Sequence, residues 1–252
     1  MTVQIVFMGT AGSGKTSLVA AFSRWLSREL GATVACVNLD PGCERLPYQP
    51  SLDIRRWFTL RQVMEEEGLG PNGALVGAVE RLLSLGEELF GRLEGLEADY
   101  VLLDTPGQAE VFLFREAGFQ LASTLKRLKP TVGVYLVDLS LARRGVVGLA
   151  ASLLLGLASQ LWVGLEGFLA FNKADLKVDV NLEEILLNPQ AFKERLLREA
   201  GVSADLSASY LEVFSRFARA QRPVKVSALT GEGLKELYDA VHETLCECGD
   251  LT

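Results

Sequence analysis

Residues 9–16 form a glycine-rich stretch whose residue types and spacing suit it to hold phosphate. Their sequence, Gly-Thr-Ala-Gly-Ser-Gly-Lys-Thr, matches the P-loop pattern Gly-x4-Gly-Lys-Ser/Thr. Glycines let the backbone wrap around a polyphosphate, so that successive N–H groups face the anion. An ordinary strand-to-helix turn is the alternative, but the complete motif favours a nucleoside triphosphate. The expected contacts are Gly12, Ser13, Gly14, Lys15, Thr16 and Ser17, with Lys15 neutralising charge and Thr16 ligating Mg²⁺.

A second polar group, Asp104-Thr105-Pro106-Gly107-Gln108, follows the apolar run 100–103. An aspartate at the end of a buried strand can hold Mg²⁺ through its water shell. Gly107 can bring a backbone N–H to the terminal phosphate, and Gln108 can orient an attacking water. The alternative, an acidic residue that merely opens a turn, is weaker because a P-loop precedes the group in the same chain.

The tetrapeptide Asn172-Lys173-Ala174-Asp175 indicates which base is bound. The Asp175 carboxylate can accept hydrogen bonds from the ring N1–H and the exocyclic amine of guanine, whereas adenine has no such pair of donors. The stem of Lys173 would pack along the base. Leaving a buried carboxylate unpaired is costly, so we expect guanine to be selected. Backbone N–H groups of Ser227, Ala228 and Leu229 could bind the guanine O6.

The tripeptide Gly70-Pro71-Asn72 lies in a turn between two segments with helical patterns. Glycine, proline and asparagine are ordinary loop residues. Local chemistry alone therefore favours a simple connection between two helices.

The surrounding sequence predicts the elements that must position these residues. Apolar and β-branched runs predict strands at 3–8, 33–38, 100–104, 132–137, 168–171 and 223–226. Helical patterns cover 17–30, 59–67, 74–93 and 233–248, while 44–69 is expected to leave the sheet as loop and short helix. Asp40 follows the second predicted strand. Because ligands bind at the carboxyl ends of parallel strands, all these motifs should meet at one edge of the sheet.

We expect an α/β fold of three layers, the P-loop NTPase fold, with a mainly parallel central sheet and helices on both faces. The 252 residues, 49% of them hydrophobic, suffice for one domain, 1–252, with helical insertions at about 44–95 and 181–221. The uncharged stretch 145–165 is long enough to span a membrane. A single span would separate the P-loop from Asn172, however, so we expect a buried helix and no membrane association.

Charge and cysteine content limit the partners and the compartment. The formal net charge of −7 argues against direct nucleic-acid binding, which needs clustered basic residues. The four cysteines are too few for a disulfide scaffold, so a reducing, cytoplasmic location fits best. Cys246 and Cys248 could supply half of a metal site with His242, but a structural or incidental role is favoured.

Taken together, the P-loop, residues 104–108, 172–175 and 227–229, and the turn Gly70-Pro71-Asn72 resemble the GPN-loop GTPases over essentially the whole chain. The ending, residues 248–252, is similar to archaeal members. The resemblance reverses the interpretation of the turn. It implies a SIMIBI-class GTPase that forms a homodimer, binds GTP or GDP with Mg²⁺, and reaches the phosphates of one subunit with Gly70, Pro71 and Asn72 of the other.

The resemblance also implies roles for individual residues. Those in catalysis would be Asp40, Asn72, Asp104, Gln108 and Glu110, and those near the metal would be Thr16, Asp40 and Asp104. Asp40 is preferred to Asp53 because it ends a sheet strand. Phosphoryl transfer mainly needs positioning and electrostatic stabilisation, so no covalent nucleophile is expected. No arginine finger is evident in the motifs, which predicts slow turnover.

A P-loop also occurs in three other classes of protein. Eukaryotic relatives are linked to RNA polymerase assembly, so the protein could be a nucleotide-switched assembly factor for unspecified protein clients, in which hydrolysis resets partner binding. A small-molecule kinase has no need of Asn-Lys-x-Asp, and a single histidine argues against metal delivery.

Overall fold

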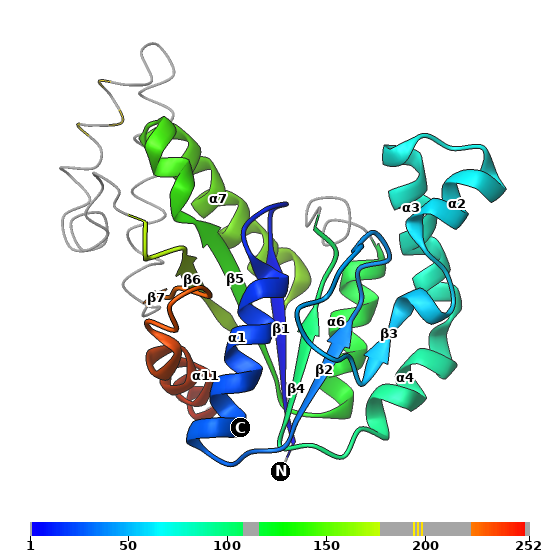
Figure 1. Ribbon diagram of the computed structural model, residues 1–252, viewed down its shortest axis with the longest axis horizontal. Helices are drawn as coiled ribbons and strands as arrows, with labels where there is room; N and C mark the ends of the chain where they lie inside the picture. Colours follow the sequence, from blue (N-terminus) through cyan, green and yellow to red (C-terminus); the bar gives the residue numbers. More distant parts are fainter. Residues whose placement is uncertain are drawn as a thin grey trace.

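The central feature of the computed structural model is a parallel β-sheet (Figure 1). The structure describes residues 2–107, 116–176 and 223–249, and the single residues 194, 196 and 198. In this part of the chain the sheet has seven strands in the order β3-β2-β4-β1-β5-β6-β7, and each pair is parallel. The strands are β1 (Val3–Gly9), β2 (Val34–Asn38), β3 (Leu52–Asp53), β4 (Tyr100–Asp104), β5 (Thr131–Asp138), β6 (Gly167–Asn172) and β7 (Val224–Lys225).

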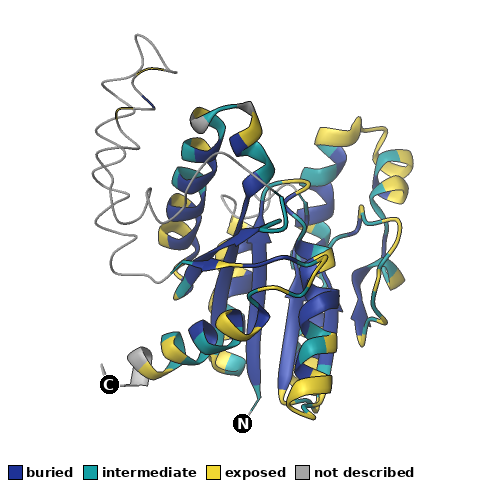
Figure 2. Ribbon diagram, turned by 60° about the vertical axis from the view of Figure 1, so that its left-hand side comes forward, coloured by how far each residue is buried: buried dark blue, intermediate teal, exposed yellow. Residues whose placement is uncertain are grey.

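Helices cover both faces of this sheet, as the burial of every residue of β1 requires, because successive side chains point to opposite faces. Val3, Ile5 and Phe7 pack with one hydrophobic cluster, whereas Val6 and Met8 pack with another. The first cluster includes α1 (Lys15–Glu29) and α11 (Leu234–Gly249). The second includes α2 (Leu60–Glu67), α3 (Pro71–Ser84), α4 (Gly86–Glu94), α6 (Glu116–Leu128) and α7 (Val146–Val163). Figure 2 shows the sheet buried between these layers, and the predicted fold class is confirmed.

The strand register brings the carboxyl ends of the strands to one edge. Asp104 of β4 is level with Phe7 of β1 and with Asn38 of β2. On the other side of β1, Asp138 of β5 is level with Asn172 of β6. The loop between β1 and α1 therefore starts at the middle of a row of polar strand ends.

Two details of the predicted insertion at 44–95 are wrong. Within 44–69 the chain returns to the sheet for two residues, because β3 pairs with β2 at the sheet edge, where Leu52 is buried; the rest of the segment is loop and short helix. A short 3₁₀ helix, η1 (Ile54–Arg56), follows. The predicted helix 74–93 is two helices, α3 and α4, and the backbone between them turns at Gly86 with φ 27°. Only glycine adopts that conformation readily.

The uncharged stretch 145–165 forms α7, preceded by the 3₁₀ helix η2 (Leu139–Arg144). One face of α7 packs against β5, but Leu161 and Trp162 are 73% and 56% exposed, so the expected burial is only partial. Of the helices in the described residues, none combines the length and apolarity needed to cross a membrane.

Candidate functional site

The phosphate loop joins β1 to α1 and is held by its own lysine. The Lys15 side chain is only 5% exposed, and its Nζ donates to the carbonyl oxygens of Gly9 at 2.7 Å and Thr10 at 3.1 Å. Gly14 is the N-cap of α1 with φ 91°, and a Cβ there would lie 2.4 Å from Nδ2 of Asn172. Only glycine fits this position, and no side chain caps the start of α1, where backbone N–H groups can face an anion.

Asn172 connects the phosphate loop to the loop after β7. Its Nδ2 donates to the carbonyl oxygen of Ser13 at 2.8 Å, and its Oδ1 accepts from the backbone N–H of Ala228 at 3.3 Å. Asn172 is 1% exposed, so these bonds are protected from water. The predicted phosphate and base segments are thus brought together by one buried side chain.

The side chains on either side of the predicted base position are also fixed. The Ser227 hydroxyl donates to Oδ1 of Asp175 at 2.5 Å and accepts from the N–H groups of Leu229 and Thr230. The sequence alone predicts only a backbone role for Ser227. The Lys173 ammonium forms an ion pair with Asp138 at 2.6 Å, which holds the lysine stem across the end of the sheet.

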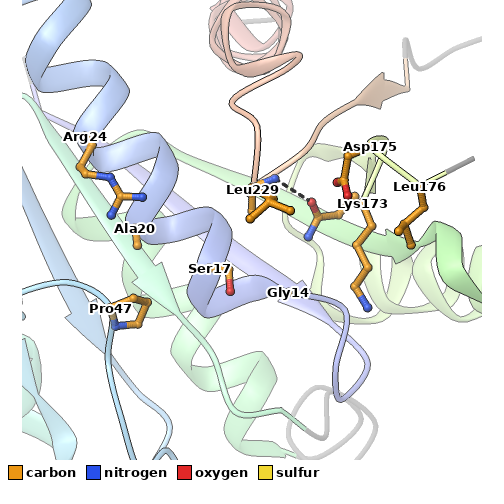
Figure 3. A pocket seen from close by; sticks show the side chains of 11 residues that line it. Gly14, Ser17, Ala20, Arg24, Pro47, Lys173, Asp175, Leu176 and Leu229 are labelled. Atoms are coloured by element: carbon orange, nitrogen blue, oxygen red, sulfur yellow. Dashed lines mark hydrogen bonds between the residues drawn. The ribbon is translucent and has the colours of Figure 1, made fainter.

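These residues line a cavity of about 400 Å³, within the usual range for small-molecule sites (Figure 3). Helix α1 supplies one wall, and the Asn172–Asp175 and Ala228–Leu229 segments supply the facing wall. Leu229 is 83% exposed beside the cavity, so a bound ring could cover it. The lining residues are Gly14, Ser17, Ala20, Arg24, Pro47, Asn172, Lys173, Asp175, Leu176, Ala228 and Leu229.

Asp104 lies at the phosphate end of the site with no exposed surface. Burial raises the pKa of Asp104 to about 6, although hydrogen bonding to Thr16 and Tyr48 and the charge of Lys15 partly offset this. Its Oδ2 accepts from the Tyr48 hydroxyl at 3.0 Å. Its Oδ1 is buried and has no hydrogen-bond partner among the described residues.

Asp40 occupies the turn after β2. Its Oδ1 accepts from the N–H of Gly42 at 2.8 Å, and its Oδ2 accepts from the N–H of Gly107 at 3.2 Å. Burial raises the pKa of Asp40, and these two bonds oppose the rise. Asp40 therefore connects the segments that follow β2 and β4.

Asp53, unlike Asp40, is held by the side chains of Arg55 and Asn38. Burial would raise its pKa, but hydrogen bonds from Arg55 and Asn38 hold the pKa of Asp53 below its usual value. Both of its oxygens accept from Arg55.

The residues present fit a hydrated magnesium ion. Among the described residues no three His, Cys, Asp or Glu side chains form a cage, but Mg²⁺ in phosphate sites usually keeps several waters and takes one or two carboxylates. The orphaned Oδ1 of Asp104, close to Thr16 and Lys15, is a buried acceptor that such a water could satisfy.

The turn Gly70-Pro71-Asn72 begins α3. Gly70 is its N-cap, Pro71 is its first residue, and all three residues are exposed. Figure 1 shows the α2–α3 connection well away from the loop between β1 and α1. Within one chain, the structure does not bring Asn72 to the phosphate loop.

Several predicted features lie outside the described residues. Gln108 and Glu110 do, as does nearly all of the predicted insertion 181–221. In the described part, Cys36, Cys43 and Cys246 are free thiols. His242 forms a 2.9 Å hydrogen bond with the Tyr100 hydroxyl.

Sequence reasoning missed two residues that support the site, Asp138 and Tyr48. Asp138 ends an apolar strand in the same way as Asp104, so its position could have been recognised. Tyr48 lies in an irregular segment, where no local pattern marks a side chain that reaches Asp104.

A phosphate loop at the carboxyl edge of a parallel sheet, with helices on both faces, defines the class as the P-loop NTPases. Residues 7–247 match the sequence model of a family described as "Conserved hypothetical ATP binding protein". The chain is 38% identical over 260 residues to GPN-loop GTPase PAB0955 of Pyrococcus abyssi, covering 98% of this chain and 99% of that protein. The protein thus belongs to the GPN-loop GTPase family.

Two further comparisons agree with this assignment. The crystal structure of PAB0955 from Pyrococcus abyssi, titled a GTPase in apo form, superimposes with a TM-score of 0.79 at 34% identity, covering 97% of this chain and 98% of that one. GPN-loop GTPase 1 of Dictyostelium discoideum is 30% identical over 243 residues, 95% of this chain but 60% of its own length.

Proposed function

We propose that the protein binds GTP and hydrolyses it to GDP and phosphate in a Mg²⁺-dependent reaction, as a homodimer in which the Gly-Pro-Asn turn acts in trans. The observation that carries the proposal is the cavity between α1 and Asp175, which Gly14 of the P-loop also lines. Relatives named GTPases, matched over nearly the whole chain, support the same activity.

The choice of guanine rests on Asp175. The matching family description names ATP, but adenine offers no N1–H and no amine at C2. The Ser227 hydroxyl bonds one oxygen of Asp175 and leaves the carboxylate with further lone pairs. A base that fails to satisfy them would lose binding free energy, because the desolvated carboxylate would stay underpaired.

The phosphates would be held by α1 and its preceding loop. When phosphate enters, Lys15 would exchange its bonds to Gly9 and Thr10 for phosphate oxygens. Thr16 and Asp104 would hold Mg²⁺, which neutralises charge on the transferred group. The N–H of Gly107, now bonded to Asp40, would turn to the terminal phosphate, with Asp40, Gln108 and Glu110 as candidates to position water.

The trans contribution rests on the placement of Asn72. Its exposure at the start of α3, away from the phosphate loop of its own chain, supports delivery to a second copy. The amide and the N-terminus of α3 would there stabilise the charge that develops on phosphate. In this arrangement a complete site requires two chains.

Substituting Asp175→Asn tests the base assignment. The wild-type protein should bind GDP at least about 100-fold more tightly than ADP, as follows from an unpaired buried charge. The variant should lose that preference and gain affinity for xanthosine diphosphate, whose C2 carbonyl can accept from the new amide. Isothermal titration with the three diphosphates measures these affinities.

The control is Asp239→Asn, which changes an exposed residue of α11 that is paired with Lys235. Equal GDP and ADP affinities in the wild type would refute the guanine assignment.

A further inference from the structure

Tyr48 makes a polar contact with the site that none of the motifs requires. Its hydroxyl donates to Oδ2 of the buried Asp104 at 3.0 Å. The other oxygen of that carboxylate, Oδ1, has no partner among the described residues. One side of the carboxylate is thus held by protein, and the other is left for a ligand.

The ring of Tyr48 is itself held in place. It packs against the hydrophobic cluster beneath α1, which includes Cys36 and Leu18. Pro47 precedes it and Pro50 follows, which limits the backbone conformations of the segment. The segment is fixed nearby by the bond from the Ser51 N–H to the carbonyl of Cys36 at 2.8 Å and by Arg55, whose Nη1 donates to the carbonyl of Cys43 at 2.9 Å.

A hydroxyl fixed in this way restricts rotation of the carboxylate. Groups behind a ligand residue commonly set its orientation and tune its affinity for metal. Asp104 already has a fixed backbone, because β4 is hydrogen-bonded on both sides by β1 and β2. The remaining freedom is the torsion of its carboxylate, which Tyr48 restricts together with hydrogen bonding to Thr16.

We propose that Tyr48 is a positioning residue for Mg²⁺, which acts by holding Oδ2 of Asp104 so that Oδ1 faces the hydrated ion beside Thr16. The inference rests on the proposed function, since it assumes that Asp104 serves the metal. Tyr48, from the segment between β2 and β3, would thus join Thr16 and Asp104 as a residue on which Mg²⁺ binding depends. This role requires the hydroxyl of Tyr48 as well as its ring.

The test is Tyr48→Phe in the full chain, which keeps the ring and removes the hydroxyl. GDP affinity is measured by isothermal titration in EDTA, and GDP release is then followed at increasing Mg²⁺ concentration. Affinity in EDTA should stay within about twofold, because no phosphate contact is lost. The Mg²⁺ concentration for half-maximal slowing of release should rise about tenfold, as for the loss of other groups behind a metal ligand.

Two controls separate positioning from general damage to the fold. Tyr100 lies at the end of β4 opposite to Asp104, and its hydroxyl is hydrogen-bonded to His242 of α11. Tyr100→Phe removes this bond and should leave the Mg²⁺ response unchanged. In an Asp104→Asn background, adding Tyr48→Phe should cause no further loss of Mg²⁺ response.

If Tyr48→Phe needs the same or a lower Mg²⁺ concentration than the wild type, the inference about Tyr48 is wrong, although the proposed function can still hold. The same conclusion follows if Tyr100→Phe raises the required Mg²⁺ concentration as much as Tyr48→Phe does. A wild-type protein that binds GDP with no Mg²⁺ response would overturn the metal step of the proposed function first, and the inference with it.

Discussion

At the residue scale, the buried carboxylate of Asp104 lowers the stability of the fold, although the same carboxylate is needed for the proposed metal binding. It lies at the end of a central strand with no exposed surface, and burial raises its pKa to about 6. Near neutral pH it is a buried charge, which hydrogen bonding to Thr16 and Tyr48 and the charge of Lys15 stabilise only in part. Such a group is costly until its ligand arrives, which is common where function and stability conflict.

The raised pKa predicts how stability changes with pH. The carboxyl binds a proton in the folded protein below about pH 6, but in the unfolded chain only below about pH 4. The folded state therefore binds more protons between these values, and stability falls as pH rises through this window, by about 3 kcal/mol if Asp104 acts alone.

Asp104→Asn removes this ionisation. In the absence of nucleotide, the melting temperature of the variant should exceed that of the wild type by more at pH 7.5 than at pH 5. Thermal unfolding at the two values measures the difference. Equal shifts at both pH values would show that burial of Asp104 costs little.

The residues that touch a nucleotide could be predicted from sequence because their chemistry demands particular types at fixed spacing. Gly14 and Asp175 are examples, one required by a backbone conformation and the other by a donor pattern. Tyr48 could not be predicted in this way. It reaches Asp104 across 56 positions of sequence, and only the fold determines that distance in space.

At the element scale, strands were easier to predict than the segments between β2 and β4. The buried runs of β1, β4, β5 and β6 contain apolar residues that fit no other environment in a domain of this kind. β3 has two residues, too few for any periodic signal, and its pairing with β2 depends on Leu52 finding a place in the core. The break between α3 and α4 likewise depends on Gly86, whose left-handed conformation no periodicity reveals.

The fit of α7 on the sheet gives a prediction at this scale. A Cβ at Gly156 would lie 2.7 Å from the Tyr135 ring and 2.9 Å from Leu169. Gly156→Ala should lower stability by about 1–2 kcal/mol, because overpacking outweighs the gain in helix propensity.

Gly148, in the same helix, is the matched control. The nearest atom to a Cβ there is 3.8 Å away, so Gly148→Ala should be neutral or stabilising. Urea unfolding of both variants measures the difference. Similar stabilities would mean that α7 can shift away from β5 at little cost.

At the scale of the whole molecule, the distance between Asn72 and the phosphate loop decides how the site is completed. The α2–α3 connection projects from the side of the fold that carries β3 (Figure 1). A rigid chain cannot bring the two together, so the proposed mechanism needs a symmetric pair of chains in which each supplies the turn to the other.

Mixing two variants that are each impaired in hydrolysis tests this arrangement. Lys15→Ala should lose nucleotide binding, and Asn72→Ala should bind GTP but hydrolyse it slowly. In a mixed dimer, the intact phosphate loop of the second variant meets the intact Asn72 of the first. With random exchange in an equal mixture, activity should recover to about a quarter of the wild-type value.

Phosphate release measured before and after mixing is the readout. An equal mixture of Lys15→Ala with Lys15→Ala,Asn72→Ala chains is the control and should stay inactive, because neither has a working phosphate loop. If the first mixture also stays inactive while dimers exchange, Asn72 does not act in trans.

The double hydrogen bond of Asn172 has a consequence for the kinetics of nucleotide exchange. The Asn172 amide donates to the carbonyl of Ser13 and accepts from the N–H of Ala228. One side chain therefore links the loop that would bind the phosphates to the loop that would bind the base. Movement of either loop disturbs the other. A nucleotide should therefore leave in a single step, without a long-lived state in which only the base or only the phosphates are released, and a partner that pulls on the Ser227–Leu229 loop would speed exchange without touching phosphate.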